Sequence, residues 1–534
     1  MAGTRRRSQG KRWRRGTVVV LPLAAVATAV GVSVHAAAGG APHERAVGNV
    51  AGVAEASRAA AGSVSSSPSS PSSSSSKTPT PPSKRPSKSA AASGAAASAR
   101  ASAAAAAPAV SAATPLAQRI SSTTLTLSSP LHYLEQGYNE TPQWTRVAVA
   151  ATPGGKVQVA WPAANGIHVT PLGTNLTRSG ADTVVAGAQE VGGLVAHDDG
   201  FALLTRVADS NKWNETAAAL IRYRNGARAF TDKLTGTASD DTAPVLDGQL
   251  AWNGTEYGAY FVVHGAGGFA DGHFGDKLVY TGATGTRLSG GWSWGCSHNE
   301  GIALYPEKSA PFTSVCLDDW RSGLFVSTGI GAPDVAPVLG REQCWAGYCG
   351  GAFPDGTGAI VKSAAGRYAV ALASRGAASA VKNAADTSGR GWTVTPRWNT
   401  HQVAVDFLGN SSTPSGKTVY LTDDPGTDHV NVRIAPYGGS RLLVSWESVT
   451  GAKCTSGTCT GSFGGTHLEL IDYTGKVVTP AVVVPEHISG DIAVFPDGDL
   501  AWASVKAAPN YSAALGTSPS TTTLSVSRLR LVSG

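Results

Sequence analysis

Past residue 140 the chain alternates short apolar runs with Gly-rich turns, and hardly any segment keeps a sustained helical period. Alternation with a period of two places successive side chains on opposite faces of a strand. Runs of this kind, bounded by turn residues, are typical of strands that pack between stacked sheets. The pattern therefore predicts an all-β domain.

Seven hairpins recur along this domain, each formed by two apolar runs around a turn glycine. The turn glycines are Gly155, Gly200, Gly254, Gly301, Gly366, Gly438 and Gly498, spaced 45 to 72 residues apart. Glycine supplies the positive φ of tight hairpin turns. The spacing is near the roughly 40 to 50 residues of a four-stranded propeller blade, with room for long loops. Radial closure suits a domain of this length better than one sandwich. We therefore predict a seven-bladed β-propeller over residues 119–534.

The two ends of the domain carry strand patterns that can complete one blade. Residues 521–532 (TTTLSVSRLRLV) and 123–128 (TTLTLS) would then lie side by side and join the chain ends. Four tryptophans fall inside hairpin strands, where packing between blades is the favoured interpretation: Trp161, Trp252, Trp446 and Trp502.

This sequence resembles the seven-bladed β-propellers of secreted bacterial proteins over about residues 120–534. Residues 272–280 (GHFGDKLVY) and 291–301 (GWSWGCSHNEG) are similar to a recurring motif of uncharacterised secreted proteins of this kind. The resemblance implies a fold and no activity. The signatures of WD40, kelch and leucine-rich repeats are absent, and the Asp box of sialidases is not met.

Residues 1–40 have the pattern of an export signal. Seven basic and no acidic residues precede an apolar run from Val18 to Val34, and small residues follow at Ala36 to Ala38. This order fits a cleaved signal peptide. The run is also close to the ~17 residues of a spanning helix, so an uncleaved N-terminal transmembrane anchor is the alternative. Both predict a secreted or cell-surface protein.

Residues 41–118 are rich in Ala, Ser and Pro, and no aromatic residue lies between Arg14 and His132. Such a segment cannot bury enough apolar surface to offset its ordering entropy. We predict a disordered linker that spaces the domain from a membrane or wall; a low-complexity tract with no further task is the alternative.

The charge distribution argues against nucleic acid as a partner. The chain has a formal net charge of +7, but residues 101–534 hold 29 basic against 34 acidic side chains. The folded part therefore lacks the basic surface that phosphate backbones require.

All six cysteines lie in the exported domain, which favours disulfides in an oxidising compartment. Cys344 with Cys349, and Cys454 with Cys459, each enclose four residues, a spacing that suits a bond across a hairpin loop. Locality then leaves Cys296 with Cys316, although fifteen pairings are open in principle.

A polar constellation lies between the third and fourth predicted hairpins. It holds His264, Asp271, His273, Asp276, His298 and Glu300. If the blade-end loops converge, His273, Asp276, His298 and Glu300 would ligate calcium or another divalent metal, with hydrogen bonding within the loops as the alternative. A second acidic loop, residues 423–429, lacks the spacing of a calcium loop.

Loop aromatic residues are candidates for stacking on sugar rings. We expect a ligand to contact Trp292, Trp294, His298, Trp320 and Trp345, with packing against core or disulfides as the alternative. No nucleotide fingerprint and no serine-hydrolase elbow fits a domain with so few helices. Glycoside hydrolysis needs two carboxylates, for which Asp276 and Glu300 are the first pair.

The sequence thus predicts an exported, disulfide-stapled propeller that recognises an extracellular glycan or cell-surface protein. We expect a monomer that binds no nucleic acid and meets the membrane only through its N-terminal segment. An extracellular polysaccharide hydrolase is the second hypothesis, and a subunit of a surface assembly is the third.

Overall fold

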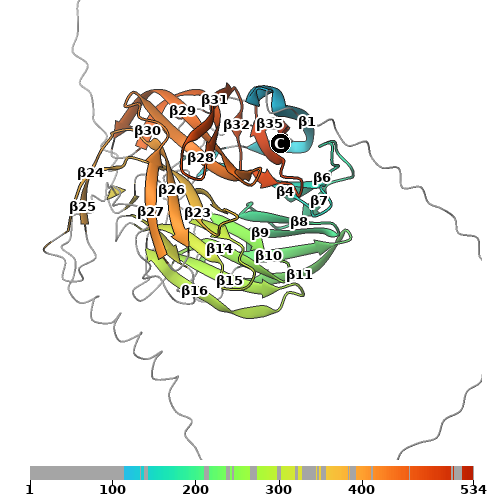
Figure 1. Ribbon diagram of the computed structural model, residues 1–534. Coiled ribbons are helices and arrows are strands. Elements are labelled where there is room, and N and C mark those ends of the chain that lie inside the picture. The colour runs from blue at the N-terminus through green and yellow to red at the C-terminus, as the bar shows by residue number, and fades with distance from the viewer. Residues whose placement is uncertain are drawn as a thin grey trace, which may run out of the picture. The chain divides into compact units, whose positions relative to one another are not determined.

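The computed structural model describes residues 114–532 with internal gaps, of which the longest are 210–215, 265–273, 328–343, 350–356, 385–391 and 512–519. The described residues all belong to one unit, Pro82–Gly534. They form an all-β fold with the arrangement of a β-propeller (Figure 1). The single helical element in this described part is the 3-10 turn η1 (Leu116–Arg119). No helix among the described residues is long and apolar enough to cross a membrane.

Three antiparallel sheets come first along the chain. The first contains β4 (Ala148–Ala151), β5 (Val157–Ala163), β6 (Gly166–Leu172) and β7 (Thr183–Val185); the second contains β8 (Gly193–His197), β9 (Gly200–Ala208), β10 (Thr216–Arg224) and β11 (Ala227–Lys233); the third contains β12 (Asp241–Thr242), β13 (Gly248–Trp252), β14 (Glu256–His264), β15 (Phe274–Gly282) and β16 (Arg287–Ser297).

A sheet of three strands follows, and then two of four. The three-stranded sheet contains β17 (Ile302–Tyr305), β18 (Thr313–Asp318) and β19 (Gly323–Ser327); the next contains β22 (Thr357–Lys362), β23 (Tyr368–Ser374), β26 (Gln402–Asn410) and β27 (Thr413–Tyr420); the last contains β28 (Thr427–Tyr437), β29 (Arg441–Thr455), β30 (Thr458–Asp472) and β31 (Val477–Val484). Three two-stranded pairs accompany them: β2 (Leu134–Gln136) with β3 (Pro142–Trp144), β20 (Cys344–Trp345) with β21 (Tyr348–Cys349), and β24 (Ala377–Lys382) with β25 (Trp392–Pro396).

The remaining sheet joins the two ends of the domain. It contains β32 (His487–Ile488), β33 (Ala493–Val494), β34 (Leu500–Val505) and β35 (Ser520–Leu529), and its edge strand is β1 (Ile120–His132) from the N-terminal side. Thr123 lies opposite Val526 and Leu125 opposite Leu524, and Figure 1 shows β1 beside β35. The predicted pairing of residues 123–128 with 521–532 is therefore confirmed.

Six of the described sheets have the four or five strands of a propeller blade, and β17–β19 has three. Seven strands, one from each of these sheets, contact each other in a closed circuit, in the order β4, β8, β13, β17, β22, β28, β33 and back to β4, and we call them the first strands. Close backbone approach in this circuit requires glycine: a Cβ on Gly490 would lie 2.1 Å from the Val147 carbonyl oxygen. The count of seven blades stays a prediction.

Apolar clusters between consecutive sheets form the core. Trp161 packs between β4–β7 and the sheet that contains β1, and Trp446 packs between the sheets that start at β22 and β28. Trp161, Trp446 and Trp502 are 0%, 3% and 2% exposed, which confirms the interpretation of these hairpin tryptophans as core residues. Trp252 packs against the cluster between the second and third sheets.

Six of the seven predicted hairpins join the first and second strands of a sheet. The hairpin around Gly301 was predicted wrongly, because β16 and β17 belong to different sheets. β17 instead pairs with β18, and residues 306–312 connect them. This connection contains Pro311 and no glycine, so the turn signal used elsewhere is missing here.

The antiparallel strands define two ends of the propeller. We call the end where the first strands begin the entry end, and the end with the hairpin turns at Gly155, Gly200, Gly254, Gly366, Gly438 and Gly498 the turn end. Since strand direction alternates, β29 and β30 meet at the entry end, while β26 and β30 finish at the turn end.

Candidate functional site

Of the four predicted metal ligands, the structure describes one. Asp276 lies in β15, is 1% exposed, and accepts a hydrogen bond of 2.6 Å from the Tyr260 hydroxyl. His273, His298 and Glu300 lie outside the described residues. The predicted metal site therefore stays a prediction, with Asp276 placed inside the fold.

The predicted sugar-stacking residues divide in the same way. Trp292 lies in β16, is 8% exposed, and packs at 6.4 Å from the Tyr260 ring in the cluster beside β17 and β18. This burial favours the alternative, packing against core residues, and the expected ligand contact of Trp292 stays a prediction. The backbones of Trp294 and Trp345 lie in β16 and β20, and their side chains are outside the described part, as are His298 and Trp320.

Disulfides are present in the propeller domain, as the sequence indicates. Cys454 and Cys459 are bonded across the β29–β30 hairpin, the pairing that their spacing predicts. Cys316 also takes part in a disulfide. Cys344 and Cys349 lie directly opposite each other in the β20–β21 ladder. Their bond, and the bond of Cys316 with Cys296, remain predictions.

The acidic loop before β28 uses its carboxylates within the protein. Asp423 accepts from the Trp398 indole at 2.8 Å, and Asp424 accepts from the Gly426 amide at 2.9 Å. Asp428, 1% exposed, accepts from the His401 amide at 2.6 Å and lies 2.8 Å from His401 Nδ1. The carboxylates of this loop therefore accept hydrogen bonds from neighbouring turn and strand residues.

A second buried carboxylate at the entry end holds a histidine. Glu447 in β29 is 0% exposed, and its Oε1 lies 2.8 Å from His487 Nδ1 and 2.6 Å from Asn431 Nδ2. The Tyr511 hydroxyl donates to Oε2. Burial opposes the charge of Glu447, but His487 and these hydrogen bonds outweigh it and lower the pKa of the carboxyl below its usual value.

Arg146 ties together the starts of several first strands at the entry end. Its guanidinium donates to the Gly192 carbonyl at 2.8 Å and to the Gly248 carbonyl, and it forms an ion pair with Asp491. Arg146 precedes β4, while its partners precede or begin β8, β13 and β33. One cation thus links four sheets of the ring.

Asp247 shares the electrostatic environment of this cation. Burial of its carboxyl and, less strongly, the Asp491 carboxylate raise the pKa of Asp247, while Arg146 and Arg433 oppose the shift; the net value is about 6. The carboxyl is enclosed although the residue keeps some exposed surface. Arg146 therefore acts on two carboxyl groups, those of Asp247 and Asp491.

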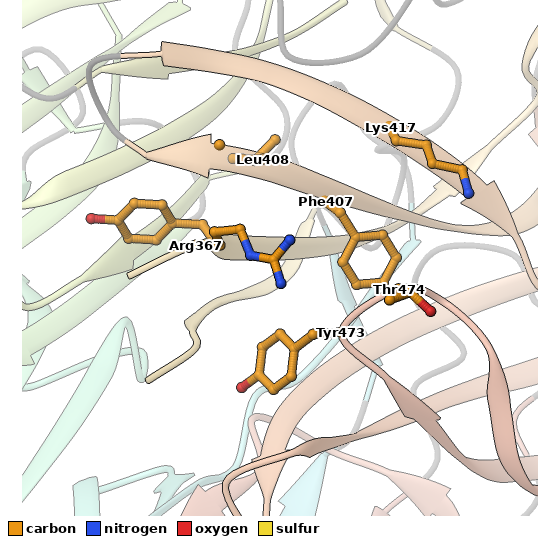
Figure 2. A pocket seen from close by; sticks show the side chains of 8 residues that line it. Arg367, Phe407, Leu408, Lys417, Tyr473 and Thr474 are labelled. Carbon is orange, nitrogen blue, oxygen red and sulfur yellow. The ribbon is translucent and has the colours of Figure 1, made fainter. Parts of the chain in front are cut away.

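A pocket of about 450 Å³ lies at the turn end, between the sheet of β22–β27 and the sheet of β28–β31. Its lining residues are Arg367, Tyr368, Phe407, Leu408, Gly409, Lys417, Tyr473 and Thr474. Arg367 closes the turn between β22 and β23, and Tyr473 and Thr474 lie in the turn between β30 and β31. Figure 2 shows the Arg367 side chain reaching into the space between the Phe407 and Tyr473 rings.

The chemistry of the pocket is aromatic and cationic. None of the eight lining residues is acidic. The nearby Glu307 is paired with Lys362, whose Nζ lies 2.6 Å from its carboxylate, and it accepts a hydrogen bond from the Tyr368 hydroxyl. Burial opposes the charge of Glu307, but the hydrogen bonds from Lys362, Tyr368 and Thr313 outweigh it and lower its pKa. Arg367 and Lys417 form no ion pair with a described residue.

Few features of the sequence indicate this pocket. Its residues come from two turns and from the three strands β23, β26 and β27, and the most distant of them, Arg367 and Thr474, are more than 100 residues apart in the sequence. Basic residues beside an aromatic residue, as in Arg367-Tyr368, were the available signal. Alternation places Tyr368 in the hairpin around Gly366, and only the packing of the two sheets brings it and Phe407 around one space.

No protein-family model matches the chain, and no curated protein is similar to it. Among solved structures, a protein of unknown function from Dyadobacter fermentans is similar with 8% identity and a TM-score of 0.36, covering 76% of this chain and 99% of that one. The WD40 domain of Toxoplasma gondii coronin is similar with 9% identity and a TM-score of 0.37, covering 80% of this chain and 90% of that one. An α-L-arabinanase of Penicillium chrysogenum is similar with 11% identity and a TM-score of 0.34, covering 76% of this chain and 98% of that one. All three are too distant to assign a family or an activity to this chain.

Proposed function

We propose that this protein is an exported recognition propeller that binds an acidic extracellular glycan in the turn-end pocket. The observation that supports it best is the combination of Arg367 and Lys417 with Phe407 and Tyr473 around one space. Aromatic faces stack on sugar rings, and guanidinium groups bind carboxylates through paired hydrogen bonds. A sugar acid presents both features to such a pocket.

The volume and the lining favour binding over catalysis. About 450 Å³ lies within the usual range of ligand pockets, which is roughly 300 to 1,000 Å³. Glycoside hydrolysis requires a pair of carboxyl groups, and the lining residues contain none. The pocket has the groups to hold an anionic sugar and lacks the groups to cleave it.

We further propose that the propeller has seven blades, with β17–β19 as the fourth. Support comes from the closed circuit of first strands, in which β17 contacts both β13 and β22. Phe312 and Cys316 pack against the third sheet, and Ala303 and Val315 pack against the sheet of β22–β27. The export pattern of residues 1–40 supports a secreted or surface-anchored location.

Binding measurements with matched oligosaccharides test the glycan proposal. The purified protein should bind oligosaccharides that contain uronic acids and bind their neutral counterparts at least about tenfold more weakly, since an ion-assisted hydrogen bond contributes about 1.5 to 3 kcal/mol. Arg367→Gln should weaken acidic-glycan binding by about 10-fold to 100-fold. Lys156→Gln removes an exposed turn-end cation outside the pocket and should leave it unchanged. Equal losses in both variants, or equal binding of neutral glycans, would reject the proposal.

A hydrolase is the second candidate, and the Asp247 and Asp491 pair favours it. Asp247 has a raised pKa, as a proton donor requires, and Asp491, paired with Arg146, supplies a second carboxyl group near it. The expected activity is release of new reducing ends from a polysaccharide, abolished by Asp247→Asn. Absence of reducing ends from every bound glycan would leave recognition alone.

A further inference from the structure

Three potential metal ligands of different chemistry gather at the entry end, away from the glycan pocket. His401 precedes β26, Asp428 lies in β28, and Cys459 lies in β30. One ligand atom from each residue lies within 4.8 Å of the other two. Nitrogen, oxygen and sulfur donors in one group are typical of zinc sites.

Two of the three ligands are held in place by the fold. The side chains of His401 and Asp428 are each 2% exposed, and His401 Nδ1 lies 2.8 Å from Asp428 Oδ1. The His401 amide also donates to the same carboxylate oxygen, at 2.6 Å. The His429 amide donates to the His401 carbonyl at 3.1 Å, which joins the two segments through the backbone. Little reorganisation is needed to bring the two side chains to one ion.

The third ligand, Cys459, cannot bind a metal while its sulfur is in a disulfide. Cys459 is bonded to Cys454, which lies opposite it in the β29–β30 ladder. The thiolate is the form of cysteine that ligates metals, and a disulfide sulfur is not a thiolate. Cys454 does not belong to the group with His401 and Asp428. The two sulfurs of this bond are therefore unequal.

We propose that the Cys454–Cys459 disulfide covers a zinc-type metal site formed by His401, Asp428 and Cys459. A dithiol reductant opens this disulfide. The dithiol is oxidised to its own disulfide, and the two electrons and two protons that it gives up convert Cys454 and Cys459 to thiols. The Cys459 thiol then gives its proton to solvent as its sulfur binds the metal. Water supplies a fourth position.

The charges favour a transition-type divalent ion over calcium. Asp428 and the Cys459 thiolate bring two negative charges, and the buried Arg375, whose charge acts on Asp428, brings one positive charge. A divalent cation is thus held by a group of net negative charge. Calcium needs six to eight oxygen ligands, and this group offers a single carboxylate.

Two serine variants that break the same disulfide test the proposal. Cys454→Ser leaves Cys459 as the free thiol, and Cys459→Ser leaves Cys454. With Co²⁺ as the probe, Cys454→Ser should bind one equivalent and show a thiolate-to-cobalt charge-transfer band. Cys459→Ser should lack the band and bind Zn²⁺ more weakly by at least the roughly 100-fold that loss of a supporting residue alone costs. Similar binding in both variants, or no band in a folded Cys454→Ser protein, would overturn the proposal.

The unmodified protein gives a second test that does not depend on how the variants fold. After reduction with a dithiol, Zn²⁺ should slow alkylation of Cys459 by about tenfold or more and leave Cys454 reactive, as measured by peptide mass mapping. Equal protection of both cysteines from alkylation, or protection of neither, would contradict the proposal that Cys459 binds the metal and Cys454 does not. Because this site and the glycan pocket lie at opposite ends, the outcome is independent of glycan binding.

Discussion

At the residue scale, the buried charges of the entry end are the most sensitive points of the molecule. Glu447 is enclosed with His487, Asn431 and Tyr511, so removing its charge weakens the hydrogen bonds that it accepts from these residues. Breaking a buried ion pair costs about 3 to 5 kcal/mol. The network therefore reports directly on the junction between the sheets that start at β28 and β32.

Glu447→Gln should lower the free energy of unfolding by about 3 kcal/mol at pH 7, because the charge-assisted contacts with His487 and Tyr511 are lost. Denaturant titration followed by tryptophan fluorescence measures the change. The control Glu486→Gln alters a partly exposed side chain and should change stability by less than about 0.5 kcal/mol. A loss no larger than that of the control would show that the network is weak.

Glu447 and Asp247 should give opposite pH dependences of stability. The pKa of Glu447 is lowered in the fold, so its stabilisation is present above its ordinary value of 4.5 and is lost as the pH falls below it. The pKa of Asp247 is raised to about 6 from 3.8, so the folded protein holds this proton more tightly and loses stability as the pH rises from about 4 to about 6.

Asp247→Asn should remove that loss. Between pH 4 and pH 6.5, unfolding free energies of the variant should fall less than those of the unmodified protein, by up to about 3 kcal/mol for a shift of two pKa units. Parallel pH profiles for the two proteins would mean that Asp247 titrates as it does in the unfolded chain.

At the element scale, the hairpin is the unit that the sequence predicts well. Turns such as those at Gly155 and Gly498 are marked locally, by glycine with positive φ between alternating runs. The failure at Gly301 has the same cause, since a glycine between two strands does not tell whether they pair or cross to the next sheet. The pocket could not be predicted, because Arg367 and Tyr473 meet only through the packing of two sheets.

A substitution at Gly490, just before β33, tests the contact between β33 and β4. Gly490→Ala should destabilise the fold by about 1 to 3 kcal/mol, since a Cβ would lie 2.1 Å from the Val147 carbonyl oxygen. Gly426→Ala, where the nearest atom is a side-chain oxygen at 3.4 Å, is the matched control in an exposed turn. Thermal unfolding of the two variants should differ; equal midpoints would show that the ring tolerates expansion there.

At the scale of the whole molecule, closure depends on β1 from one end of the domain and β35 from the other. Deleting residues 114–132 should abolish cooperative unfolding and expose the β35 edge to association, measured by calorimetry and light scattering. Deleting residues 41–100, a segment without aromatic side chains, should leave the melting temperature unchanged. A cooperative monomer without β1 would refute the role of this strand in closure.

The β1–β35 pairing also sets an order of events for a chain that crosses a membrane from its N-terminus. β1 arrives among the first folded residues, yet its partner includes Leu529, five residues from the end of the sequence. If the proposed export passes the chain through the membrane unfolded, the ring closes only after the segment of β35 has crossed. On that proposal β1 reaches the outside first and stays without its partner strand until translocation has finished.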